Sequence, residues 1–145
     1  MGDVEFRIDE GSEFGARAAR HLREDRVAWF TTVSASGAPS PNPVWFLWDG
    51  AATVLVWNLP TAARVAHISS NPRVTLHFSG DGQGGDIVVL AGIAVVDQAR
   101  PAPDSVPGYV AKYGDAMVSV SGSQSAFATT YSTPVVVTLS KLRGH

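Results

Sequence analysis

The sequence contains no cysteine among its 145 residues. Disulfide bonds and thiolate metal sites are therefore excluded, and the composition fits a cytoplasmic protein. Charged residues make up only 17% of the chain and the formal net charge is −2, whereas an average soluble domain has roughly 25% charged residues. Nucleic acid is not an expected partner, because its binding needs clustered Lys and Arg. The low charge also indicates that a partner subunit covers part of the surface.

Long apolar runs are also absent. The longest one, residues 87–96 (IVVLAGIAVV), is too short for the ~20 residues that a membrane-spanning helix requires, so membrane insertion is not expected. The opening residues, MGDVEFRIDEG, have neither the basic nor the apolar region of a signal peptide. The length is that of one domain, so we expect a single domain over residues 1–145.

Motifs that carry catalysis by side chains are missing as well. No two of the four histidines are spaced as H-x-x-x-H or H-x-x-E-H, and no serine lies in a G-x-S-x-G elbow. A metal site and catalytic side chains are therefore not predicted. If the protein is an enzyme, we expect the reactive atom to belong to a cofactor, for which the protein supplies position and polarity.

Residues 42–50, NPVWFLWDG, predict a strand that is apolar on both faces. Side chains alternate along a strand, so Val44, Phe46 and Trp48 point to one face. Trp45 and Leu47 point to the other. One face can fill a barrel interior, and a second subunit together with a flat organic ligand would cover the other.

The rest of the chain alternates short strands with a few helices. A helix capped by Ser12 is predicted at 12–25, and a second helix is predicted to begin near Thr61, with Thr61 as its possible N-cap. Short helices are expected at 107–114 and 123–131. Strands are predicted at 26–34, 42–50, 53–58, 73–79, 86–96 and 133–142. Six strands with short links and few helices indicate a mainly β fold, an antiparallel barrel with short helices.

A glycine-rich segment, GDGQGG at 80–85, matches the G-x-G-x-x-G pattern of dinucleotide-binding loops. Such a loop has to open a helix, whereas DIVVLAG at 86–92 continues as a strand. We therefore interpret 80–85 as a hairpin loop. Three aspartates lie beside turn glycines, where this residue usually stabilises the turn: Asp49, Asp81 and Asp86.

Residues 57–64, WNLPTAAR, are the best candidate for an anion site. A strand ends and a helix begins here, so free backbone N–H groups, the Thr61 hydroxyl and the Arg64 guanidinium could meet an anionic ligand tail. An ordinary capped helix with a solvated arginine explains the same residues, and the pattern alone leaves both interpretations open. The sequence also contains four tryptophans, whose side chains could either pack in the core or contact a ligand, and both interpretations stay open: Trp29, Trp45, Trp48 and Trp57.

The order of these segments resembles that of a known family, the pyridoxamine-5′-phosphate-oxidase-like split barrels. More narrowly, it is similar to the actinobacterial flavin/deazaflavin oxidoreductase B group, which uses coenzyme F420. The resemblance covers about residues 20–145, and its most specific pieces are PNPVWF and NPRVTLHF. It implies a six-stranded antiparallel split β-barrel, and a homodimer with two cofactor sites at the interface.

The resemblance also implies where a cofactor would bind. The ring of a deazaflavin or flavin would lie against Pro43, Val44 and Trp45. The phosphate tail would run to the segment 57–64, whose predicted cofactor-binding residues are Trp57, Asn58, Thr61, Ala62 and Arg64. Family members commonly place a lysine in this segment, whereas an arginine is its only cation here.

The activity implied by the resemblance is hydride transfer between reduced coenzyme F420 and a planar, electron-poor, small-molecule substrate. Two alternatives remain open at this point. One is an FMN-dependent oxidoreductase of the same fold. The other is a non-catalytic protein that binds or stores a cofactor, haem or another tetrapyrrole.

Overall fold

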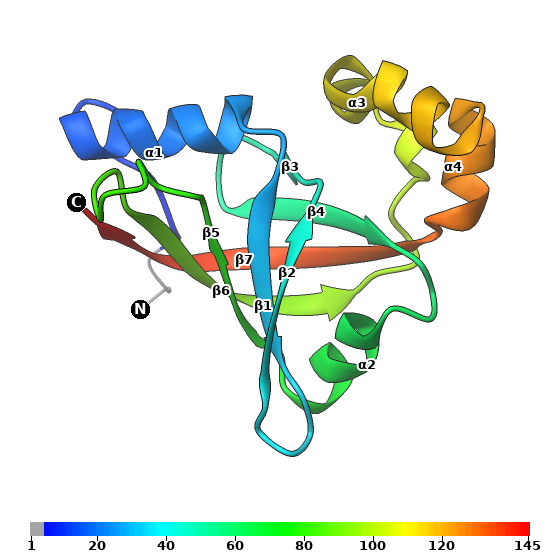
Figure 1. Cartoon of the computed structure of the whole chain (residues 1–145), viewed down its shortest axis with the longest axis horizontal. Coiled ribbons are helices and arrows are strands. Elements are labelled where there is room, and N and C mark those ends of the chain that lie inside the picture. The colour runs from blue at the N-terminus through cyan, green and yellow to red at the C-terminus, as the bar shows by residue number, and fades with distance from the viewer. Residues whose placement is uncertain (1–4) are drawn as a thin grey trace.

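The computed structural model describes residues 5–145. Their fold is built around one curled antiparallel sheet. Its seven strands lie in the order β2-β1-β5-β6-β7-β4-β3, and each neighbouring pair is antiparallel. Figure 1 shows β1 and β2 running steeply across β6 and β7, so the sheet curls into half a barrel. The predicted mainly β split barrel is confirmed. The strands are β1 (Ala28–Val33), β2 (Pro39–Val44), β3 (Leu47–Trp48), β4 (Thr53–Asn58), β5 (Arg73–His77), β6 (Val88–Val96) and β7 (Thr133–Gly144).

Helices lie at the ends of this sheet. In Figure 1, α1 lies over one end, α3 and α4 stand together at the other, and α2 lies beneath. Ser12 caps α1 by accepting a hydrogen bond from the Gly15 N–H at 3.0 Å, as the sequence predicts. Within residues 5–145, no helix has both the length and the apolar composition needed to cross a membrane. The helical elements are α1 (Glu13–Glu24), α2 (Ala63–Ser70), the 3-10 turn η1 (Pro103–Ser105), α3 (Pro107–Ser121) and α4 (Gln124–Thr130).

Residues 1–4 lie outside the described part of the chain. They belong to the opening segment in which the sequence predicts no signal peptide.

The strand predicted over 42–50 is interrupted. The chain forms β2 up to Val44 and β3 at Leu47–Trp48, with Trp45 and Phe46 outside the ladder. The Phe46 N–H donates instead to the hydroxyl of Tyr113 on α3, at 3.1 Å. A hydrogen bond from a distant helix therefore replaces a strand partner, and the sheet has seven strands where the sequence predicts six.

Side-chain alternation survives this interruption. Val44, Phe46 and Trp48 all belong to the buried core inside the curled sheet. Trp45 and Leu47 pack on the opposite side, against a second apolar cluster made by Trp57, Tyr109, Tyr113, Met117 and Phe127. The second face was expected to meet another subunit and a ligand. The chain's own α3 and α4 cover much of it, because their aromatic side chains supply the apolar surface that the strand requires.

Two helices differ from their predicted bounds. α2 begins at Ala63 with Ala62 in the cap position and no side-chain cap, so the prediction that Thr61 caps it is wrong. The Ala62 N–H donates to the Leu59 carbonyl at 3.0 Å, which places the exposed Thr61 in the turn before the helix. α3 continues to Ser121 rather than stopping near 114, and the left-handed Gly122 (φ 89°) ends it.

The glycine-rich segment 80–85 connects β5 and β6, which are antiparallel neighbours, so the hairpin interpretation is confirmed. Asp81 accepts hydrogen bonds from the N–H groups of Gln83 (2.8 Å) and Gly85 (2.9 Å), as expected of a turn aspartate. The same expectation is wrong for Asp86. Its carboxylate leaves the turn and pairs with Arg17 and His21 of α1.

Candidate functional site

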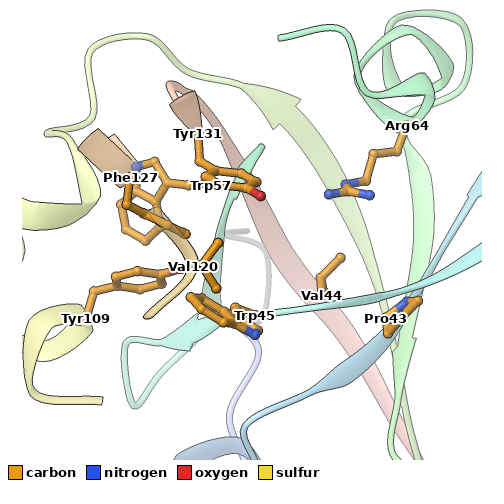
Figure 2. Close-up of a pocket in the computed structure, with 9 residues that line it drawn as sticks. All are labelled: Pro43, Val44, Trp45, Trp57, Arg64, Tyr109, Val120, Phe127 and Tyr131. Carbon is orange, nitrogen blue, oxygen red and sulfur yellow. The ribbon is translucent and has the colours of Figure 1, made fainter. Parts of the chain in front are cut away.

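A cavity of about 270 Å³ lies where the end of β2, the end of β4, α2 and the α3–α4 pair meet (Figure 2). Five of the eight predicted cofactor-binding residues line it. Asn58 lies behind the wall and holds Arg64, whereas Thr61 and Ala62 are not part of the lining. The lining residues are Pro43, Val44, Trp45, Trp57, Arg64, Tyr109, Val120, Phe127 and Tyr131.

Aromatic rings form one side of the cavity, as Figure 2 shows. The Trp45 indole stacks on Phe127 with ring centroids 5.4 Å apart and planes 13° from parallel. Phe127 in turn stacks on Tyr131 at 4.4 Å. Trp57 meets Tyr109 edge to face at 4.7 Å, and its indole N–H donates to the Pro101 carbonyl at 3.2 Å. This wall offers flat apolar surface to a flat ligand.

Arg64 faces this wall from the other side of the cavity (Figure 2). Its Nε–H donates to the Asn58 carboxamide oxygen. Within residues 5–145, no carboxylate lies within ion-pair distance of its guanidinium, which is half-buried. Burial lowers the pKa of Arg64, yet a guanidinium stays charged at neutral pH. The cavity therefore contains a cation that no anionic group of the described residues neutralises.

Asn58 orients that cation. Its side chain is fully buried at the end of β4, and its amide group donates to the carbonyls of Val56 (2.9 Å) and Thr133 (3.0 Å). These two bonds fix which end of the carboxamide is the oxygen. That oxygen accepts from Nε of Arg64, so the two terminal nitrogens of the guanidinium are left to meet a ligand.

The lining contains few groups that transfer protons. Aspartate, glutamate, histidine and lysine are absent from its nine residues in the described chain. Burial raises the pKa of the Tyr109 hydroxyl, which makes it a poor proton donor. The cavity is therefore suited to binding and orientation more than to acid–base catalysis by side chains.

Four lining residues were missed by sequence reasoning. They lie on α3, on α4 or at the residue that ends α4. A signal for the three aromatic ones exists in the spacing of the aromatic residues. Tyr109 and Tyr113 are four residues apart, as are Phe127 and Tyr131, which places each pair on one face of a helix. The missed residues are Tyr109, Val120, Phe127 and Tyr131.

A metal centre is not evident in the described chain. Within residues 5–145, no three His, Asp or Glu side chains come together in a way that could hold a metal ion.

Comparison with known families shows which family the chain belongs to. The family model described as pyridoxamine 5′-phosphate oxidase matches residues 14–138. The chain belongs to the pyridoxamine 5′-phosphate oxidase family. The match runs from α1 into β7 and includes all the residues that line the cavity.

Solved structures share the fold of this family member at low sequence identity. A structure named F420 reductase has a TM-score of 0.62 and 20% identity, with 84% of this chain and 92% of that chain covered. A conserved hypothetical protein from Mycobacterium tuberculosis has a TM-score of 0.66 and 16% identity, with 97% and 88% covered. HutZ, the haem storage protein from Vibrio cholerae, has a TM-score of 0.58 and 12% identity, with 96% and 95% covered. No match was found among curated protein sequences.

Proposed function

We propose that this member of the pyridoxamine 5′-phosphate oxidase family is an oxidoreductase that uses coenzyme F420 to reduce or oxidise a planar, electron-poor organic substrate. One observation carries the proposal: a half-buried arginine, with no anionic partner in the part of the chain that the structure describes, faces a cavity whose other wall is aromatic. A flat ring with an anionic tail matches both sides of that cavity. The fold shared with a structure named F420 reductase supports the choice of deazaflavin.

The residues present fit such a cofactor. When bound, a reduced deazaflavin supplies the hydride, so the protein needs no nucleophile of its own. Pro43, Val44 and Trp45 offer the surface for the ring, and Arg64 offers two guanidinium nitrogens to phosphate oxygens. Trp57, Phe127 of α4 and Tyr131 after it would exclude water from the ring. Thr61 and Ala62 do not line the cavity, and the Ala62 N–H already donates to the Leu59 carbonyl, so neither residue is part of this proposed contact.

A second copy of the chain is part of the proposal. The volume of about 270 Å³ is slightly below that of typical ligand pockets, which measure roughly 300–1,000 Å³. Pro43 at the rim is exposed and pairs in register with Trp29 on β1, which is 36% exposed. On β6, which is separated from β1 by β5, Ile93 and Val95 are exposed as well. A homodimer that buries this sheet face would also lengthen the site.

Titration of the purified protein with coenzyme F420, and separately with FMN, tests the cofactor. Trp45 and Trp57 line the cavity, so binding there should quench tryptophan fluorescence. We expect saturable binding of F420 and weaker binding of FMN. FMN that remains bound through purification, visible as a yellow colour, would instead favour an FMN-dependent oxidoreductase of the same fold.

A charge reversal tests the anion site. Arg64→Glu should weaken F420 binding roughly tenfold or more, because it replaces a charged donor by a like charge, and it should change the melting temperature much less. Arg20→Glu is the matched control, since Arg20 is an exposed residue of α1 away from the cavity. Equal losses of affinity and melting temperature in Arg64→Glu would refute the anion-binding role.

The second candidate is a non-catalytic protein that binds a tetrapyrrole. The scarcity of proton-transferring groups in the cavity favours it, and the fold is shared with a haem storage protein. Oxidation of reduced F420 by menadione, followed with and without the protein, separates the two. Acceleration by the protein supports the oxidoreductase, whereas no acceleration together with a shifted Soret band on addition of haem supports the binding protein.

A further inference from the structure

The interruption between β2 and β3 leaves the main-chain N–H and carbonyl of Phe46 outside the ladder, and two residues of α3 bind them. The Phe46 N–H donates to the Tyr113 hydroxyl at 3.1 Å, and the Phe46 carbonyl accepts a hydrogen bond from Lys112 Nζ at 3.2 Å. Tyr113 also donates to the Arg26 carbonyl at 2.7 Å. Two consecutive residues of α3 therefore hold both polar groups of a residue that has left the sheet.

Lys112 makes this contact from a half-buried position. Its ammonium is half-buried and lies 3.8 Å from the centroid of the Phe46 ring, in cation–π range. The guanidinium of Arg26 donates to the Lys112 carbonyl at 2.7 Å, so a second cation is close. Within the described chain, no carboxylate lies within ion-pair distance of Lys112. The charged and titratable groups that face it are Arg26, Asp25 and Tyr113, and Asp115 borders the same hollow.

These surroundings favour the neutral form of the Lys112 amine. Burial and the neighbouring Arg26 lower the pKa of Lys112 to about 8, although Asp25 acts in the opposite direction. The ammonium therefore loses its charge in mildly alkaline solution. The neutral amine can still donate to the Phe46 carbonyl, but a hydrogen bond from an uncharged donor is weaker, and the cation–π attraction is lost.

Phe46 is next to a residue that lines the cavity. Trp45 directly precedes Phe46, lines the cavity, and stacks on Tyr113 with centroids 4.8 Å apart and planes 5° from parallel. We infer that Lys112 and Tyr113 are positioning residues that clasp the main-chain N–H and carbonyl of Phe46 and thereby fix the Trp45 wall of the cavity, with the Lys112 ammonium as the part that responds to pH. For its effect on ligand binding, this inference rests on the proposed function.

The first test needs no ligand. The indole N–H resonance of Trp45, assigned with Trp45→Phe, is followed by ¹⁵N NMR as the pH is raised from about 6.5 to about 9.5, across the pKa of about 8. We expect this resonance to titrate with a midpoint near 8 in the wild type. Lys112→Met should remove the titration, and Lys112→Arg should also remove it because arginine keeps its charge.

Lys141 provides the control, because it is the only other lysine of the chain and is exposed on β7. In Lys141→Met the Trp45 resonance should titrate as it does in the wild type. A Trp45 resonance that does not move in the wild type, or one that still moves in Lys112→Met, would overturn the inference.

The second test measures the affinity for FMN and F420 over the same pH range. Wild-type affinity should fall roughly three- to tenfold as the charged hydrogen bond becomes neutral, while Lys112→Arg should retain its affinity and Lys112→Met should be weak throughout. Titration of Trp45 without binding of either ligand would refute the proposed function and leave the clasp intact. Ligand binding without titration of Trp45 would refute the clasp and leave the proposed function intact.

Discussion

The carboxamide oxygen of Asn58 accepts a hydrogen bond from Nε of Arg64, joining the end of β4 to the first turn of α2. Asn58 is fully buried, and its amide group is held by two main-chain carbonyls. A buried neutral side chain therefore aims a cation at the cavity without neutralising its charge. An aspartate at the same position would bind the arginine more tightly and would cancel the charge that attracts an anion.

Asn58→Ala should lower the free energy of unfolding by about 2–3 kcal/mol, because it removes two donors and one acceptor from a buried position. Urea denaturation measures this loss. Asn71→Ala is the control, since Asn71 is only half-buried and accepts one hydrogen bond, from the Arg73 N–H at 3.2 Å. Losses of similar size in the two variants would show that Asn58 has no special structural role.

Tyr113→Phe should cost about 1–3 kcal/mol of stability, since it leaves the Phe46 N–H and the Arg26 carbonyl without their partner. The ring of the phenylalanine can still stack on Trp45. Tyr109→Phe is a matched control, because no hydrogen bond to the Tyr109 hydroxyl is present within residues 5–145. We expect Tyr109→Phe to change the unfolding midpoint little, and the opposite order of the two effects would contradict the clasp at Phe46.

His21 should make stability depend on pH. Burial lowers the pKa of His21, but its hydrogen bonds with Asp25 (2.7 Å) and Asp86 (3.0 Å) outweigh burial and raise it overall. The hydrogen bond from His21 and the ion pair with Arg17 lower the pKa of Asp86. The protonated histidine therefore stabilises the fold fully below its unfolded pKa of about 6.5, and this contribution is lost as the pH rises through the higher folded value.

Urea unfolding of the wild type and His21→Gln checks this sign. The stability advantage of the wild type should be largest near pH 5–6, above the range in which Asp86 becomes protonated, and should shrink as the pH rises above about 6.5 through the higher pKa of the folded state. His145→Gln, at an exposed C-terminal position, retains His21 and should keep the pH dependence of the wild type. An advantage that grows with rising pH would show that the imidazole is neutral in the fold.

Gly92→Ala should destabilise the sheet. Gly92 lies at the register shift between β6 and β7, and an added Cβ would be 2.7 Å from the Thr138 carbonyl oxygen. We expect a loss of about 1–3 kcal/mol, typical of overpacking. At Gly108 the added methyl would meet only Leu47 methyl groups at 3.6 Å, so Gly108→Ala should be neutral or stabilising, and thermal unfolding compares the two.

Much of the fold could be predicted from local patterns. The strand predicted at 53–58 is β4 within the same bounds, and the alternation of Val44, Phe46 and Trp48 identifies core residues correctly. Hydrophobic period and turn chemistry act over a few residues, so they can be read along the chain. The hairpin interpretation of 80–85 succeeded for the same reason: a helix pattern is absent after the glycines.

The candidate site could be predicted only in part. Pro43, Val44, Trp45, Trp57 and Arg64 line one cavity, yet nothing in their sequence positions shows that α3 and α4 close it with Tyr109 and Phe127. Thr61 was misplaced because a hydroxyl before a helix predicts a cap, whereas the hydrogen bond between Ala62 and Leu59 puts a turn there. A turn and a cap use the same residue types, so sequence alone does not separate them.

The sequence by itself determined the strands, their buried faces and the mainly β class, because these follow from side-chain periodicity within short segments. Only the tertiary structure decided where the strand 42–50 breaks, since the Phe46 N–H is bound by a hydroxyl 67 residues away. It also decided that Arg64 has a neutral, buried partner and faces an aromatic wall. Such contacts join residues with no local signal in common, and they exist only once the sheet has curled and the helices have packed on it.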